Sequence, residues 1–191
     1  MSTTSQPPTP VIPYSRTART LHWITVALVA VQVPVGVTMA YRGNTLNVWD
    51  ALTDALYSSH KLIGLTLLTV VLWRLAYRCT RGAPPDEPTI ERWQKLASHA
   101  NHWALYLLLV ATAVTGYVGI SLFPALDLFG GFTLPGLVAP DKAAASRAFA
   151  VHGALAIGLV LLIALHVAAA LFHYAVRKDN VLGRMIPRLL R

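Results

Sequence analysis

Cysteine is almost absent from this sequence of 191 residues, and charged residues are scarce. The single Cys79 cannot form an intramolecular disulfide, a zinc site built from several cysteines, an iron–sulfur cluster or a C-x-x-C-H attachment for covalent haem. Only 13% of the residues are charged and 55% are apolar, which excludes a disordered or fibrous chain. The apolar residues gather into long blocks separated by short polar stretches, and this arrangement is typical of a membrane protein.

Four of these blocks are long enough to cross a bilayer as helices, which takes about 20 apolar residues each. They cover residues 21–41, 60–77, 102–123 and 152–176. The segment 1–14 contains four prolines among Ser and Thr, and it lacks a pattern that could pack. We therefore expect an all-α integral membrane four-helix bundle in residues 15–191, preceded by a flexible N-terminal tail in residues 1–14.

The first span could also be taken for a signal peptide, because two arginines precede it and Thr38-Met39-Ala40 resembles a weak cleavage site. Its apolar run of about 20 residues is longer than the apolar region of an ordinary signal peptide. We therefore keep this helix in the mature protein.

Basic residues are distributed unequally between the two ends of the predicted bundle. Loops that stay in the cytoplasm carry an excess of Lys and Arg, so the richer side is expected to be cytoplasmic. This predicts both termini in the cytoplasm, and it explains the net charge of +8 without a nucleic-acid partner. The richer side has Arg16, Arg19, Arg74, Arg78, Arg81, Arg92, Lys95, Arg177, Lys178, Arg184, Arg188 and Arg191, and the other has Arg42, Lys61, Lys142 and Arg147.

Seven histidines stand out in this apolar chain, because ionisable groups inside a bilayer are expensive and usually functional. His152 and His166 are fourteen positions apart in the last span. At 100° and 1.5 Å per residue they lie within about 40° of one helix face and about 21 Å apart along it. One helix therefore offers two ligands at two depths.

A noncovalent haem in a bundle needs axial ligands from facing helices, so each of these histidines needs a partner at its own depth. His60, at the outer start of the second span, is level with His152, and His22, at the inner start of the first, is level with His166. The spacing thus predicts two bis-histidine haems b, with the pairs His60/His152 and His22/His166. His173 lies seven residues beyond His166 on the same face and is an alternative inner ligand.

Three glycines follow the histidine spacing and would leave a surface without side chains beside the outer haem. The alternative is that they only permit close helix packing, as glycines in membrane helices often do. Gly36 and Gly116 follow His22 and His102, respectively, at the same spacing that separates His152 from His166, and Gly64 lies one turn after His60.

Two further features lie near the cytoplasmic end. Arg74 follows His60 at this same spacing, so it is placed either to pair with haem propionates or simply as an interfacial cation. His99 and His102 lie one turn apart at the start of the third span, where they could bind a propionate, relay protons to a quinone, bind a metal or only mark the interface. The location of a quinone site stays open.

In combination, several motifs resemble the bacterial four-helix cytochrome b561 family over residues 14–188. They are Thr20-Leu21-His22-Trp23, Ser59-His60-Lys61-Leu62-Ile63-Gly64, Ser98-His99-Ala100-Asn101-His102, and the stretch from His152 through His166 to His173-Tyr174-Ala175-Val176-Arg177-Lys178-Asp179-Asn180. The resemblance implies a dihaem cytochrome b of the bacterial inner membrane, whose axial ligands match His22, His60, His152 and His166. Some members of that family are superoxide oxidases, which pass an electron from superoxide to ubiquinone.

An anionic donor such as superoxide should be attracted by cations near the outer haem. Lys61 directly follows one predicted ligand, and Arg147 lies five residues before another, so both are candidates for a superoxide entry site. The expected partners are the lipid bilayer, a quinone and superoxide or another small donor, without an obligatory protein partner. The alternative function is a haem-bearing membrane anchor that collects electrons from a soluble dehydrogenase or hydrogenase.

Overall fold

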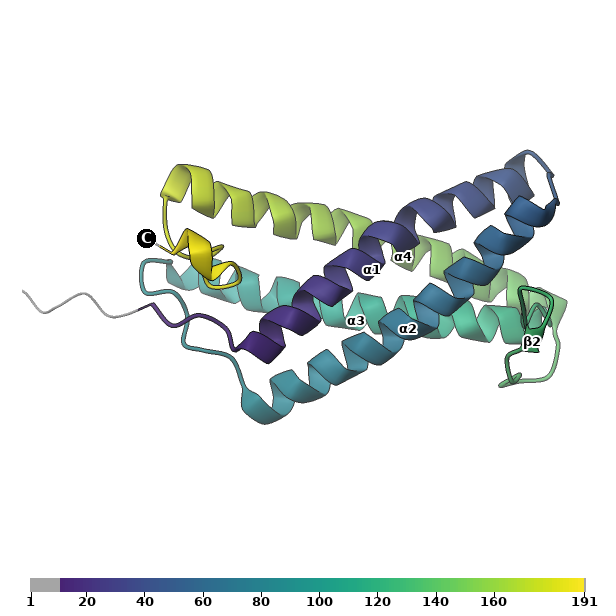
Figure 1. The fold of residues 1–191 in the computed structure, drawn as a ribbon, viewed down its shortest axis with the longest axis horizontal. Coiled ribbons are helices and arrows are strands. Elements are labelled where there is room, and N and C mark those ends of the chain that lie inside the picture. The colour runs from purple at the N-terminus through teal and green to yellow at the C-terminus, as the bar shows by residue number, and fades with distance from the viewer. Residues whose placement is uncertain (1–10, 191) are drawn as a thin grey trace, which may run out of the picture.

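Four long helices form the fold of the computed structural model, which describes residues 11–190 (Figure 1). The helices are α1 (Arg16–Ala40), α2 (Ala51–Arg81), α3 (Arg92–Leu122) and α4 (Lys142–Phe172). The π-helical segments η1 (Tyr41–Thr45) and η2 (His173–Arg177) extend α1 and α4, and the 3-10 helix η3 (Pro187–Leu189) lies near the C-terminus. All four helices are long and apolar enough to cross a membrane, which confirms the all-α membrane bundle.

The helices begin earlier than the apolar blocks. α2 starts nine residues before His60, and α3 starts ten residues before His102, so the prediction that these histidines start their helices is wrong. The extra turns mix polar and apolar residues, and capping stabilises them. Asp50 accepts a hydrogen bond from the Thr53 backbone N–H, and Glu91 forms a reciprocal capping box with Gln94.

The bundle consists of two helical hairpins, α1–α2 and α3–α4, that meet chiefly along α2 and α3. Their small core contains Leu67 and Val71 of α2, Leu109 of α3 and Leu159 of α4. Many other large apolar side chains face outward, including Leu107 at 69% exposure and Leu161 at 66%. An apolar surface of this kind suits a lipid environment, in which apolar side chains need no cover.

The loop between α3 and α4 covers one end of the bundle (Figure 1). Within it, β1 (Asp127–Leu128) pairs antiparallel with β2 (Phe132–Thr133). The loop docks on α2, because Lys61 Nζ donates to the Asp127 carbonyl at 2.8 Å and the Phe129 N–H donates to Ser58 Oγ at 3.0 Å. We call this the outer end; the start of α1 and the C-terminal segment lie together at the opposite, inner end (Figure 1).

At the inner end, Arg184 of the C-terminal segment forms hydrogen bonds with the segment before α1 and with the loop between α2 and α3. Its side chain is 7% exposed and donates to the carbonyls of Ile12, Pro84 and Pro85, and its guanidinium lies 5.2 Å from the centre of the Tyr14 ring. Residues 12 and 14 of the predicted tail therefore contact the bundle, whereas residues 1–10 lie outside the described residues. The division between tail and domain stays a prediction.

Candidate haem sites

The structure brings both predicted histidine pairs together, and each pair joins the two hairpins. At the outer end the ring centres of His60 on α2 and His152 on α4 lie 6.1 Å apart. At the inner end the ring centres of His22 on α1 and His166 on α4 lie 6.4 Å apart. Two imidazoles that share one metal through bonds of about 2 Å have ring centres about 6 Å apart. Both spacings match a shared iron.

His60 is seated against two residues of α1 that lie one turn apart, Gln32 and Gly36. The Gln32 amide nitrogen donates to the His60 carbonyl at 3.0 Å and lies 3.4 Å from His60 Nε2. A Cβ added to Gly36 would lie 2.8 Å from His60 Cε1, so only glycine leaves room for this ring. Gly64 contacts the same seat, since a Cβ there would lie 3.1 Å from the Gln32 amide nitrogen.

His152 has an equivalent seat on α3, made by Thr112 and Gly116. His152 Nδ1 lies 2.8 Å from the Thr112 carbonyl oxygen, to which the protonated Nδ1 donates. This hydrogen bond leaves Nε2 free to bind a metal, the usual arrangement for a ligating histidine. A Cβ added to Gly116 would lie 2.9 Å from both Cε1 and Nδ1 of His152. Each outer histidine thus contacts a glycine and one hydrogen-bonding group of the other helix in its hairpin, which is the Gln32 side chain for His60 and the Thr112 backbone carbonyl for His152.

The inner pair has a third histidine beside it. His102 of α3 lies 5.2 Å from His166 between ring centres, and its Nδ1 donates to the Ser98 carbonyl at 2.6 Å. The separation of 5.2 Å is shorter than two histidines on opposite sides of one iron would have, so His22, at 6.4 Å, suits His166 better as a partner. Asn101 also faces this pair, with its amide nitrogen 3.4 Å from His166 Nδ1.

Arg74 of α2 adds a positive charge to the inner pair. It lies close enough to His22, His102 and His166 to act on each electrostatically, and its guanidinium lies 5.3 Å from the Tyr106 ring centre. Among residues 11–190 it forms no ion pair with a carboxylate. A half-buried cation without an acidic partner suits an anionic group such as a haem propionate.

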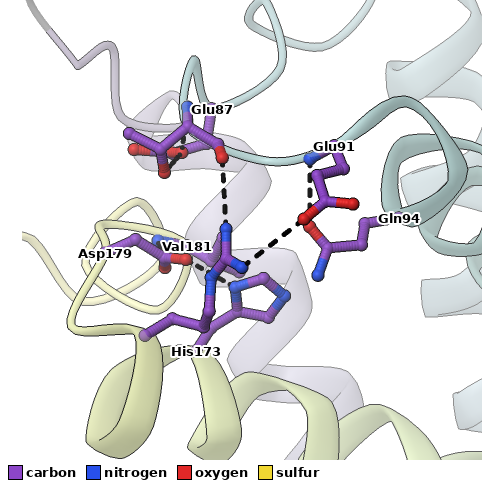
Figure 2. A network of polar contacts seen from close by, with 8 residues as sticks. Glu87, Glu91, Gln94, His173, Asp179 and Val181 are labelled. Carbon is purple, nitrogen blue, oxygen red and sulfur yellow. Dashed lines mark hydrogen bonds and ion pairs between the residues drawn. The ribbon is translucent and has the colours of Figure 1, made fainter.

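The other two histidines at this end lie away from the pair. His173 Nδ1 contacts the Asp179 carboxylate at 2.6 Å, and the two side chains face each other in Figure 2. Its partner is therefore the C-terminal segment, which leaves His166 as the inner candidate. His99 is exposed and pairs with Asp86 at 3.2 Å, so the structure separates it from His102.

The chemistry of these residues fits noncovalent haem. His22 Nδ1 and His60 Nδ1 are buried without a hydrogen-bond partner among the described residues, one in each pair. The same part of the chain has no group of three or more His, Cys, Asp or Glu residues that could hold a metal ion by themselves. Two histidines on facing helices, with glycines where a ring must fit, suit an iron whose remaining ligands come from a macrocycle.

The two candidate superoxide residues lie at the outer end but differ in their surroundings. Lys61 is half-buried, and its ammonium is held by the Asp127 carbonyl, one residue after His60 in α2. Arg147 is exposed in the second turn of α4. The structure shows no contact between them.

Sequence reasoning missed three polar residues that contact the histidines: Gln32, Asn101 and Thr112. Gln32 and Thr112 lie in otherwise apolar spans and one turn before the predicted Gly36 and Gly116. A polar side chain in an apolar span was the signal that could have found Gln32. Thr112 contacts His152 through its backbone carbonyl, so its residue type carried no such signal.

Comparisons with known proteins identify the family. The family model described as prokaryotic cytochrome b561 matches residues 13–188. Cytochrome b561 homolog 2 of Escherichia coli K12 is 31% identical over 174 residues, covering 91% of this chain and 90% of that protein. Cytochrome b561 homolog 1 of the same strain is 28% identical over 179 residues, with coverage of 92% and 97%. The probable superoxide oxidase CybB of Yersinia pestis is 25% identical over 168 residues, with coverage of 88% and 92%.

The family model covers most of the chain, including all four long helices. The family implies haem b binding and membrane electron transfer. The chain therefore belongs to the prokaryotic cytochrome b561 family of multi-pass bacterial membrane proteins.

Proposed function

We propose that this protein transfers single electrons from superoxide on the periplasmic side of the inner membrane to ubiquinone. The observation that carries the proposal is the pair of histidine sites at two depths of one bundle, His60/His152 and His22/His166. A relative named as a probable superoxide oxidase supports the choice of donor. We place both termini in the cytoplasm, as the distribution of basic residues predicts.

The four histidines have the role of holding two haems b. When bound, haem supplies one-electron redox chemistry, and the protein sets its position and potential. With each iron held by two histidines, oxygen and superoxide would not bind the iron directly. Gly36 and Gly116 leave the space that the rings of His60 and His152 occupy.

At the outer end, Lys61 and Arg147 have the role of attracting the superoxide anion. Lys61 adjoins the ligand His60, and its ammonium stays near this site because it donates to the Asp127 carbonyl. Fixed positive charge near a reaction site raises the local concentration of an anion and speeds its encounter.

At the inner end, Arg74 would neutralise haem propionates, because it acts electrostatically on all three histidines there and pairs with no carboxylate among the described residues. His102 lies within the same cluster and His99 faces solvent beside Asp86. Both stay candidates for contact with a propionate or with the quinone and its protons.

The test uses the purified single chain. A reduced-minus-oxidised spectrum with haem quantification should give two b haems, superoxide should reduce them, and ubiquinone should reoxidise them. Two haems that do not react with superoxide would contradict the donor and favour an anchor for a soluble dehydrogenase or hydrogenase. Fewer than two haems would contradict the pairing of the histidines.

A further inference from the structure

A groove at the inner end combines three arginines with an apolar wall. It lies between the first three turns of α1 and the C-terminal segment around η3. Arg16 and Arg19 enter it from α1, and Arg188 enters it from η3. Segments from opposite ends of the chain thus bring their positive charges to one place.

These arginines are free of acidic partners. None of the three forms an ion pair or a side-chain hydrogen bond in the described part of the chain, and Arg16 and Arg188 are exposed. Two other arginines of the C-terminal segment are already engaged, since Arg177 approaches Glu91 and Arg184 donates to three carbonyls. No carboxylate lines the groove, so its positive potential is not compensated.

The wall of the groove continues from the arginines into the apolar part of α1. Trp23, Ile24 and Ala27 line it, and Trp23 and Ile24 are 43% and 41% exposed. The Trp23 ring nitrogen donates to the Met185 carbonyl at 3.5 Å, which joins the two walls of the groove. A tryptophan between a charged rim and an apolar surface is typical of the membrane interface.

We propose that this groove is a binding site for an anionic phospholipid. The arginines match the phosphate in charge and in hydrogen-bond geometry, and the apolar wall matches an acyl chain that extends into the bilayer. Other occupants would match only one of the two features. A soluble phosphate would not contact the apolar wall, and a neutral lipid would not neutralise the three arginines.

The bound lipid has a structural consequence for the inner histidine pair. Its phosphate bridges Arg188 of η3 to Arg19, which lies one turn before His22 in α1. It thereby fixes the C-terminal segment against the helix that carries His22. The site does not depend on the electron donor or acceptor, so it stands apart from the proposed function.

The test measures lipid binding to the purified full-length protein by native mass spectrometry. The probes are dioleoyl phosphatidylglycerol, dioleoyl phosphatidylethanolamine of the same chain length, and inorganic phosphate. We expect the wild-type protein to retain phosphatidylglycerol in preference to the other two. Equal retention of the two lipids, or equally strong binding of inorganic phosphate, would overturn the proposal.

Variants locate the site. R16Q, R19Q and R188Q together should weaken phosphatidylglycerol binding at least tenfold, because each arginine near a membrane surface contributes about fivefold. A matched triple variant, R78Q, R81Q and R92Q, removes the same charge outside the groove and should leave this binding unchanged. An equal loss in both would show general attraction to the membrane surface and would overturn the site.

A second variant tests the apolar wall without changing the charge. Ala27→Trp places a large ring where the acyl chain is expected to lie, and it should reduce phosphatidylglycerol binding while α-helical circular dichroism is retained. Unchanged lipid binding in the folded variant would contradict the acyl-chain position.

Discussion

The four half-buried histidines are the residues on which the cofactor assignment depends. His60→Ala should lower haem content from two per chain to one, because His152 then loses its partner at a ring-centre distance of 6.1 Å. His22→Ala should remove the inner haem in the same way, since His166 loses the partner at 6.4 Å. Pyridine haemochrome quantification of the purified variants measures both losses.

His99→Ala is the matched control for these variants, because His99 is exposed and bonded to Asp86. It should retain both haems. The opposite pattern at the inner end, two haems in His22→Ala and one in His102→Ala, would show that His102 is the axial partner of His166.

Two glycines set the room available to the outer histidines. Gly36→Ala and Gly116→Ala should each displace a ring, because the new Cβ would lie 2.8 Å from His60 Cε1 or 2.9 Å from His152 Cε1. Overpacking of this kind costs about 1–3 kcal/mol. We expect a lowered content or a shifted reduction potential of the outer haem, measured by redox titration.

Gly158→Ala is the control for the glycine variants, since a Cβ at that position meets only a methyl group at 4.0 Å. It should titrate like the wild-type protein. If Gly36→Ala and Gly116→Ala also titrate like the wild type, these glycines serve helix packing alone.

The charge at the outer end should determine how fast superoxide reacts. Lys61→Gln and Arg147→Gln should each slow superoxide-dependent haem reduction by about threefold at low salt, and the difference from wild type should shrink as salt screens the charges. Stopped-flow absorbance at several ionic strengths measures this. Lys142→Gln removes a charge at the exposed start of α4 and serves as the control. Equal rates in all four proteins would contradict an entry site at Lys61 and Arg147.

The sequence predicted the two histidine pairs and singled out Gly36 and Gly116, but it did not predict the hydrogen-bonding contacts beside these glycines. Spacing along a helix gives the depth and face of a histidine, and the alternation of spans gives the end at which it lies. The contacts of Gln32 with His60 and of Thr112 with His152 also depend on how each helix is rotated against its hairpin partner. That rotation is set by packing and is not contained in the spacing of one helix.

At the scale of helices, hydropathy located the spans but not the helix ends. The apolar block of α2 was predicted from residue 60, whereas the helix begins at Ala51, after the N-cap Asp50. A hydrophobic run reports where lipid surrounds a helix, while capping and backbone hydrogen bonding determine where the helix starts. His60 consequently lies more than two turns inside α2.

Arg184 stabilises the inner end by joining the C-terminal segment to two others. Arg184→Ala should lower the free energy of unfolding by about 3 kcal/mol, because it leaves the carbonyls of Ile12, Pro84 and Pro85 without this donor. Thermal unfolding in detergent, followed by circular dichroism, measures the loss. Limited proteolysis should cleave the segment after Lys178 sooner than in the wild-type protein.

Arg188→Ala is the control for that experiment, since Arg188 is exposed and makes no hydrogen bond among the described residues. In detergent without added lipid it should unfold at the wild-type temperature. An Arg184→Ala variant that is equally stable would show that the joined segments hold together by apolar packing alone.

At the scale of the whole molecule, contacts within each hairpin position the histidines, and the histidine pairs form between the hairpins. Each outer histidine is seated by the other helix of its hairpin, but each histidine pair spans both hairpins. Two shared irons would therefore join α1 and α2 to α4, helices whose direct contacts are fewer than those within each hairpin. Cofactor binding and the association of the hairpins are then coupled, because a ligand that binds only the assembled state stabilises it.

Orientation in the membrane is the remaining property of the whole chain, and it decides which histidine pair faces the periplasm. Twelve basic residues at the inner end against four at the outer end predict cytoplasmic termini. Green fluorescent protein fused after Arg191 should fluoresce, and alkaline phosphatase fused at the same position should be inactive, because the first folds in the cytoplasm and the second needs the periplasm to form its disulfides. The same phosphatase inserted in the loop before α4 should be active. The reverse result would put His22 and His166 on the periplasmic side, and the superoxide site proposed at Lys61 and Arg147 would then face the wrong compartment.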